Sequence, residues 1–110
     1  MAARATAAIA SAEELLLADL VVAECVYVLE SFYEVEREQV AVLMRAAIAL
    51  PSIKTVDSAS LLRALEVYEV DCLDFAEAYL VAQAEATGVR SVLSFDRSLD
   101  RVGTVQRQEP

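Results

Sequence analysis

The stretch GVRSVLSFD, residues 88–96, decides the fold of this 110-residue chain. Gly88 stands where a helix would end in a left-handed residue, and Val, Leu and Phe dominate residues 89–95, which is typical of a β-strand. Asp96 then follows at the carboxyl end of the predicted strand. In parallel α/β folds, ligands gather beyond the carboxyl ends of the strands. Residues 88–96 therefore predict a strand that delivers a carboxylate to a functional edge.

The rest of the chain alternates between helical and strand-like patterns on both sides of this stretch. Gly88 ends a helix that Asp74 begins, and Asp57 or Ser58 begins the helix before it. Strands are expected at residues 14–17 and 53–56, with a short edge strand at 102–106, and further helices at 2–11, 19–33 and 34–50. Strands separated by helices of this length imply right-handed crossovers. We therefore expect an α/β fold, a small parallel sheet of three to four strands flanked by helices, in a single domain over residues 1–110.

Composition narrows the chemistry that the chain can perform. Hydrophobic residues make up 57% of the chain and charged residues 25%, which is typical of a compact globular protein. The chain contains no His, so imidazole zinc sites and Ser-His or Cys-His catalytic sites are excluded. A formal charge of −9 disfavours a broad basic nucleic-acid surface, yet it allows an acidic metal pocket in which a cation meets the phosphate. Any catalysis is expected to use carboxylates.

The same composition bears on location. The two cysteines, Cys25 and Cys72, lie far apart, which favours free thiols in a reducing compartment. The longest apolar runs are about five residues, where a membrane span needs about 18. Residues 1–12 have no apolar core of the kind that a secretory signal needs. We expect a cytoplasmic protein that does not enter a membrane.

Four acidic residues are candidates for a site, and each has an ordinary structural alternative. Glu24 interrupts an apolar helical run, and the alternative is that the helix turns it to the solvent. Glu77 follows Asp74 at the spacing of a capping box. Asp96 could cap a short helical turn, and Asp100 could pair with a neighbouring arginine, Arg97 or Arg101, on the surface. Together, however, Glu24, Glu77 and Asp96 could converge beyond one edge of the sheet, as an oxygen site for Mg²⁺ or Mn²⁺.

Three segments resemble the acidic motifs of the PIN domain family of ribonucleases, in order and with the family's spacing. AECVYVLE (residues 23–30) resembles the second motif, LDFAEAYL (residues 73–80) is similar to the third, and LSFDRSLDR (residues 93–101) resembles the fourth. The resemblance, which covers nearly the whole chain, implies a Rossmann-like PIN fold, bound Mg²⁺ or Mn²⁺, and endoribonuclease activity of the VapC toxin type. The implied partners are RNA, a cognate antitoxin and a second subunit in a homodimer.

The resemblance also assigns roles to individual residues. Glu24 and Asp96 match metal-binding acids, and Asp100 matches a position that is often acidic. Glu77 stands where the family usually has Asp, and Ser94 stands where the family often has Thr or Ser. The family opens with a strand that ends in Asp-x-Asn, which nothing here matches, and residues 1–10 instead resemble the helix that follows it. This strand would lie in the middle of the sheet, so we expect an N-terminally truncated domain with exposed strand edges.

Three interpretations follow. The chain is a metal-dependent endoribonuclease, weakened by the missing Asp; or it is a catalytically inactive PIN-like protein that acts through self-association or a partner; or its acids form a solvated face with no site.

Overall fold

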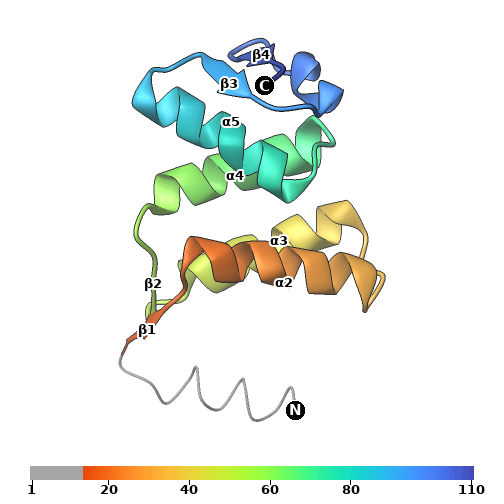
Figure 1. The fold of residues 1–110 in the computed structure, drawn as a ribbon. Helices are drawn as coiled ribbons and strands as arrows, with labels where there is room; N and C mark the ends of the chain where they lie inside the picture. The colour runs from red at the N-terminus through yellow and green to blue at the C-terminus, as the bar shows by residue number, and fades with distance from the viewer. Residues whose placement is uncertain (1–13) are drawn as a thin grey trace.

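The computed structural model describes residues 14–110, in which pairs of helices lie between very short strands (Figure 1). The predicted helix at residues 2–11 lies outside the described part. The elements run in the order β1 (Leu15–Leu16), α2 (Asp19–Ser31), α3 (Arg37–Ala49), β2 (Ile53–Lys54), α4 (Ser58–Val70), α5 (Phe75–Thr87), β3 (Ser91–Leu93), the 3-10 helix η1 (Arg97–Arg101) and β4 (Gln106–Gln108). The α/β class predicted from the sequence is confirmed.

Helix ends follow the local sequence in most places. Asp57 caps α4 by accepting hydrogen bonds from the Ser60 amide at 3.2 Å and the Ser60 hydroxyl at 2.7 Å. Gly88 ends α5 in the left-handed region, with φ at 75°, as its position after the helix predicts. Asp19 was expected to cap the helix predicted at residues 19–33, but Ala18 holds the cap position of α2 and Asp19 is its first helical residue.

The four strands found within residues 14–110 form two separate parallel pairs. Leu15 pairs with Ile53 in the first pair, and Ser91 pairs with Gln106 in the second. The single sheet of three to four strands is therefore divided into two, and β4 begins at the residue where the predicted tail strand was expected to end. Each strand has only two or three residues, so each pair holds few ladder hydrogen bonds. The expected absence of a central strand stays a prediction, since residues 1–13 are outside the description.

The core lies mainly between α4 and α5, which pack side by side in the middle of the molecule (Figure 1). Leu61, Leu65 and Tyr68 from α4 and Val81 from α5 are fully buried. Leu99, on η1, is fully buried as well, so the segment after β3 is anchored to this core. Burying a side chain of this size contributes about 1.5–3 kcal/mol relative to exposure.

Helix α2 contributes much less to the core. Only Val22 and Val26 are buried on it, whereas Leu20 is 80% exposed and Tyr27 69% exposed. The α2 surface therefore presents apolar side chains to solvent next to the acidic residue Glu24.

None of the helices within residues 14–110 is long and apolar enough to cross a membrane.

Candidate metal centre

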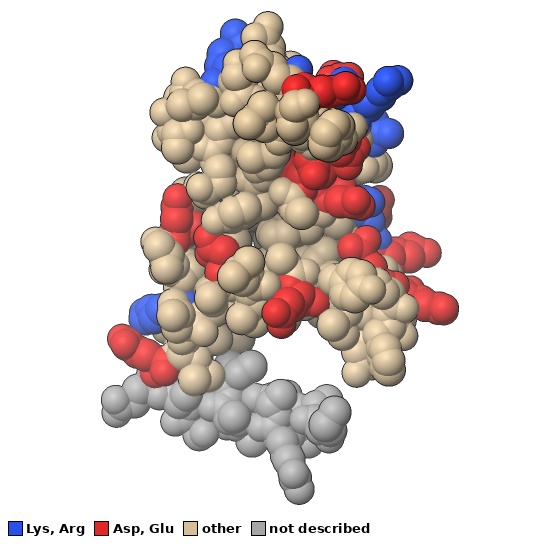
Figure 2. Space-filling model, in the orientation of Figure 1, with Lys and Arg blue, Asp and Glu red and all other residues tan. Residues whose placement is uncertain are grey.

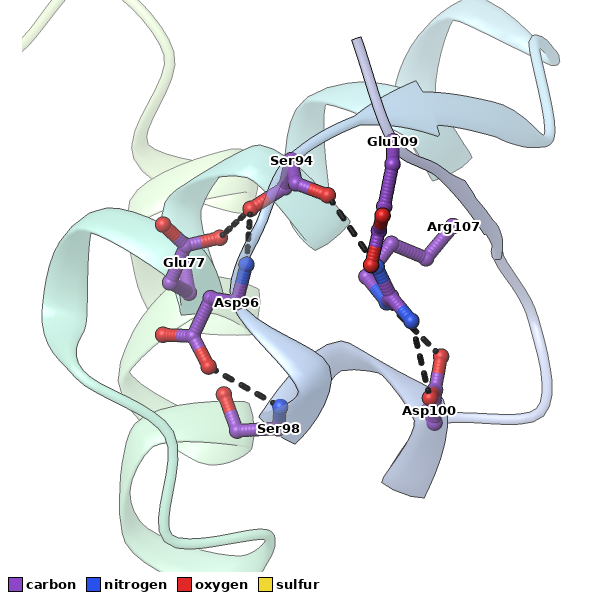
Figure 3. Close-up of polar contacts among 7 residues, drawn as sticks. All are labelled: Glu77, Ser94, Asp96, Ser98, Asp100, Arg107 and Glu109. Atoms are coloured by element: carbon purple, nitrogen blue, oxygen red, sulfur yellow. Dashed lines mark hydrogen bonds and ion pairs between the residues drawn. The ribbon is translucent and has the colours of Figure 1, made fainter.

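Two of the four predicted acids meet where α5 begins and β3 ends. The Ser94 hydroxyl donates a hydrogen bond to Glu77 Oε2 at 3.2 Å and accepts one from the Asp96 amide at 3.0 Å (Figure 3). Glu77 belongs to the first turn of α5, Ser94 follows β3, and Asp96 precedes η1. One hydroxyl thus links the Glu77 carboxylate to the backbone of Asp96, 19 residues further along the sequence. We call Glu77 and Asp96 the acid pair and Ser94 its bridging serine.

Asp96 is held as an ionised carboxylate. It caps η1, and its Oδ1 accepts a hydrogen bond from the Ser98 amide at 2.9 Å. This bonding to Ser98, together with the positive charges of Arg101 and Arg107, lowers the pKa of Asp96 below its ordinary value. The sequence-based expectation that Asp96 caps a short helical turn is confirmed, and capping leaves its second oxygen available for a ligand.

The pKa of Glu77 is shifted in the opposite direction, above its ordinary value. Burial raises its pKa, and the negative charges of Asp96 and Asp74 add to the increase, while the hydrogen bond from Ser94 opposes it. The capping box predicted for Asp74 and Glu77 is not formed: Asp74 occupies the cap position of α5 but makes no side-chain cap hydrogen bond. The reason is that Glu77 is directed to Ser94 instead. A carboxylate with a raised pKa beside a like charge is a common property of functional sites.

Asp100 lies away from the acid pair. It forms an ion pair with Arg107 at 3.1 Å, and Arg107 also donates to the Ser94 carbonyl at 3.3 Å and pairs with Glu109 at 3.2 Å (Figure 3). The expected pairing with Arg97 or Arg101 is therefore corrected to Arg107, which β4 brings back alongside η1. Sequence reasoning missed Arg107, because the predicted tail strand ended one residue before it.

Glu24 is placed separately, on the exposed face of α2 beside Leu20 and Tyr27. This is the solvent-facing alternative that the sequence left open. Within residues 14–110, no hydrogen bond joins Glu24 to the acid pair, and no group of three or more Cys, Asp or Glu residues is arranged to hold a metal ion. The assignment of Glu24 to a metal site stays a prediction.

The acid pair supplies the atoms that a small divalent cation needs, although only two carboxylates are present in it. Mg²⁺ is commonly held by one or two carboxylates together with waters and substrate phosphates. Burial is the main cause of the raised pKa of Glu77, and the negative charge of Asp96 adds to it; a cation between the two carboxylates would offset that repulsion. The residues present therefore fit a divalent cation with an incomplete protein ligand set.

A partly open cavity of about 430 Å³ lies between α2 and α5. Its lining includes Tyr27 and Glu30 from α2, Asp74 before α5, and Phe75 from α5. The Tyr79 hydroxyl, in the second turn of α5, donates to Asp19 at the start of α2 and joins the two helices there. At the start of α5 the lining runs from Asp74 to Ala76 and includes neither Glu77 nor Asp96.

Comparison with known proteins assigns the family. The PIN domain matches residues 1–105 of the 110-residue chain, and the chain therefore belongs to the PIN domain family. No curated protein and no solved structure matches the chain. The family indicates nuclease activity in general, with RNA as the usual ligand and divalent metal ions as the usual cofactors.

Proposed function

As the activity of this PIN domain protein, we propose metal-dependent endoribonuclease chemistry of the VapC toxin type, with Mg²⁺ or Mn²⁺ as the cofactor. The observation that carries the proposal is the acid pair: Glu77 and Asp96, far apart in sequence, share the hydroxyl of Ser94. Both acids belong to segments that resemble PIN motifs, and both lie beside the end of β3. An oxygen-only site in a chain without His suits a hard divalent cation.

The chain's own residues set up the site for hydrolysis of a phosphodiester. Asp96, kept ionised by Ser98, provides a fixed negative oxygen. Glu77, with a raised pKa, can accept or release a proton closer to neutral pH than an ordinary Glu. Ser94 holds the two residues together, because its hydroxyl donates to the Glu77 carboxylate and accepts from the Asp96 backbone amide. A bound divalent cation supplies positive charge that polarises a phosphate oxygen and a water molecule.

Glu24 and Asp100 complete the proposed ligand set. Glu24 lies in the segment that resembles the second acidic motif. Its helix, α2, buries only Val22 and Val26, so a small rotation that turns Glu24 toward the acid pair would disturb few buried contacts. Asp100 supports the site through Arg107, which also binds the Ser94 carbonyl. We propose Glu24 as a third carboxylate and Asp100 as an accessory acid.

The proposed partners follow from the toxin type and the surface. An antitoxin segment and a second subunit are both proposed, and the exposed apolar side chains of α2, Leu20, Tyr27 and Phe32, support an association surface. Within the described residues both cysteines are free, as expected, which supports a reducing, cytoplasmic location.

Cleavage of a labelled single-stranded RNA tests the proposal. With millimolar Mn²⁺ or Mg²⁺ the protein is expected to cleave the RNA, and Asp96→Asn is expected to slow cleavage at least about 100-fold, because the site loses charge that holds the cation. Glu38→Gln, on the exposed surface of α3, is the matched control and should cleave like the unmodified protein. Intact RNA in every metal condition, or equal rates for the two variants, would overturn the proposal.

A second candidate function is a catalytically inactive PIN-like protein that acts by association. The exposed apolar side chains on α2 favour it. Sedimentation separates the candidates: a stable dimer that does not cleave RNA supports association alone, whereas a monomer that cleaves RNA excludes it.

A further inference from the structure

Charge is distributed unequally along this acidic chain. Residues 14–87 contain 14 acidic and four basic residues, a net charge of −10, whereas residues 88–110 contain three acidic and four basic residues, a net charge of +1. In the space-filling view, Lys and Arg gather at the end of the molecule that carries β3, η1 and β4, and acidic side chains are more numerous below it (Figure 2). A polyanion would therefore be repelled least at this end.

The four arginines of this end differ in whether an acidic side chain pairs with their positive charge. Arg107 is only 12% exposed and pairs with Asp100 and Glu109, so its charge is balanced. Arg101 is exposed and donates only to the neutral carbonyls of Asp71 and Cys72, at 3.4 and 3.2 Å. Its positive charge is therefore not balanced by these bonds.

Arg97 is the least constrained of the four, since the remaining one, Arg90, donates to the Gly103 carbonyl at 3.4 Å. It follows Asp96 directly at the start of η1, is exposed, and makes no hydrogen bond or ion pair within residues 14–110. Arg101 is the last residue of the same 3-10 helix, four positions after Arg97, and at three residues per turn its side chain leaves the helix about 120° around from that of Arg97. The positive charge of Arg101 also acts on Asp96. The element that Asp96 caps therefore carries one guanidinium group without a partner, that of Arg97, and one whose charge no acid balances, that of Arg101.

The arginines of the acidic body are committed elsewhere. Arg45 pairs with Glu69 at 2.7 Å, and Arg63 pairs with both Glu66 and Glu85. Arg37 donates to the backbone carbonyls of Tyr68 and Leu73 and lies over the Tyr68 ring. These arginines stabilise the fold and lie in the part of the chain with a net charge of −10, so they are poorly placed to receive a phosphate.

We propose that Arg97 and Arg101 form a phosphate-binding site for single-stranded RNA, which positions the backbone of the substrate next to Glu77 and Asp96. The proposal rests on the proposed ribonuclease function and names the residues that hold its substrate. Guanidinium groups bind phosphate oxygens through paired N–H donors, and the contacts carry no sequence preference. An acidic protein could then hold RNA through two arginines and the cation, without a broad basic surface.

Binding measured without cleavage tests the site. We would follow the fluorescence anisotropy of a labelled uridine 20-mer, in millimolar Mg²⁺, with Asp96→Asn as the background in which cleavage is expected to be slow. Arg97→Gln in this background should weaken binding about fivefold and reduce the slope of log K against log salt concentration by about 0.7, the value for one phosphate contact on a single strand. Arg101→Gln should act in the same direction.

Arg45→Gln in the same background is the matched control, because it removes the same charge from an arginine already paired with Glu69. It should leave both the affinity and the salt slope unchanged. The melting temperature of each variant checks the fold, which matters for Arg101 because it binds two backbone carbonyls. Arg97 has no such contact, so its variant tests binding alone.

The outcomes separate this proposal from the proposed function. Equal salt slopes for Arg97→Gln and Arg45→Gln, or no binding of the RNA by the background variant, would overturn the phosphate site. If the unmodified protein still cleaves RNA in that case, the ribonuclease function stands without it. If Arg97 governs salt-dependent binding but the unmodified protein cleaves nothing, the phosphate site stands and the ribonuclease function fails.

Discussion

The two regions that supply the predicted metal-binding acids differ in how firmly they are built. Around the acid pair, hydrogen bonds link α5, the end of β3 and η1, and the buried Leu99 anchors the last of these. On α2, Glu24 stands among exposed apolar side chains, and only Val22 and Val26 of that helix are buried. The acid pair is therefore held by both hydrogen bonds and core packing. Glu24 lies on a helix that only two buried side chains attach to the core, so α2 can shift more easily.

The largest expected difference between the two regions is in stability. Leu99→Ala should lower the free energy of unfolding by about 2–5 kcal/mol, because it leaves a cavity beneath η1. Leu20→Ala on α2 should change it by less than about 0.5 kcal/mol, since Leu20 is mostly in solvent. Urea denaturation measures both. An equal decrease in the free energy of unfolding at the two positions would mean that α2 is packed as tightly against the core as η1.

A smaller effect is expected from the bridging serine. Ser94→Ala removes the hydrogen bond to Glu77 and should lower the free energy of unfolding by about 1 kcal/mol. It should also raise the pKa of Glu77 further, because that bond is what opposes the increase. Carbon-detected NMR titration of the Glu77 carboxyl measures the pKa. Ser31→Ala at the end of α2 is the control, and an unchanged Glu77 pKa in Ser94→Ala would break the proposed connection.

Glu77 should give the protein a characteristic pH dependence. Its folded pKa is raised, so the folded state binds the proton more tightly than the unfolded chain, and this contribution to stability is present below the unfolded pKa and lost as pH rises through the folded pKa. Compared with the unmodified protein at the same pH, Glu77→Gln should therefore be more stable at neutral pH than it is at low pH. Asp96→Asn should lower the pKa of Glu77 by removing a neighbouring charge. Stability curves across pH check the first expectation, and a Glu77 pKa that rises in Asp96→Asn would contradict the second.

The smallest effect on stability is expected at Glu24, where a substitution should affect RNA cleavage and not the free energy of unfolding. Glu24→Gln should leave the free energy of unfolding within about 0.5 kcal/mol of the unmodified protein, because Glu24 is exposed. If Glu24 is a third metal-binding carboxylate, RNA cleavage by this variant should nevertheless fall. Cleavage that matches the unmodified protein would restrict the site to the acid pair.

Local signals in the sequence predicted most element types and several helix ends. Asp57, Gly88 and Asp96 each act within a few residues of themselves, so their capping roles were visible without a structure. The role of Glu77 was not, since a capping box and a contact with Ser94 compete for the same carboxylate and only tertiary packing decides between them. The pairing of Asp100 with Arg107 was hidden for the same reason, because it depends on where β4 returns to η1.

Sheet organisation was the least predictable part of the fold. Apolar runs indicated where strands lie, but pairing depends on which edges meet, and strands of two or three residues leave little pattern from which to infer it. The position of Glu24 was open for a related reason: the rotation of α2 decides whether its acid faces the site, and the sequence of α2 is apolar on several sides.

The claim that the acid pair binds a divalent cation is tested most directly by NMR during a titration with Mn²⁺, whose unpaired electrons broaden the signals of nearby nuclei. The amide signals of Glu77, Ser94 and Asp96 are expected to disappear first, at Mn²⁺ concentrations below that of the protein, and to persist in Asp96→Asn. Broadening spread over the many other acids of residues 14–87, and unaffected by Asp96→Asn, would contradict the claim.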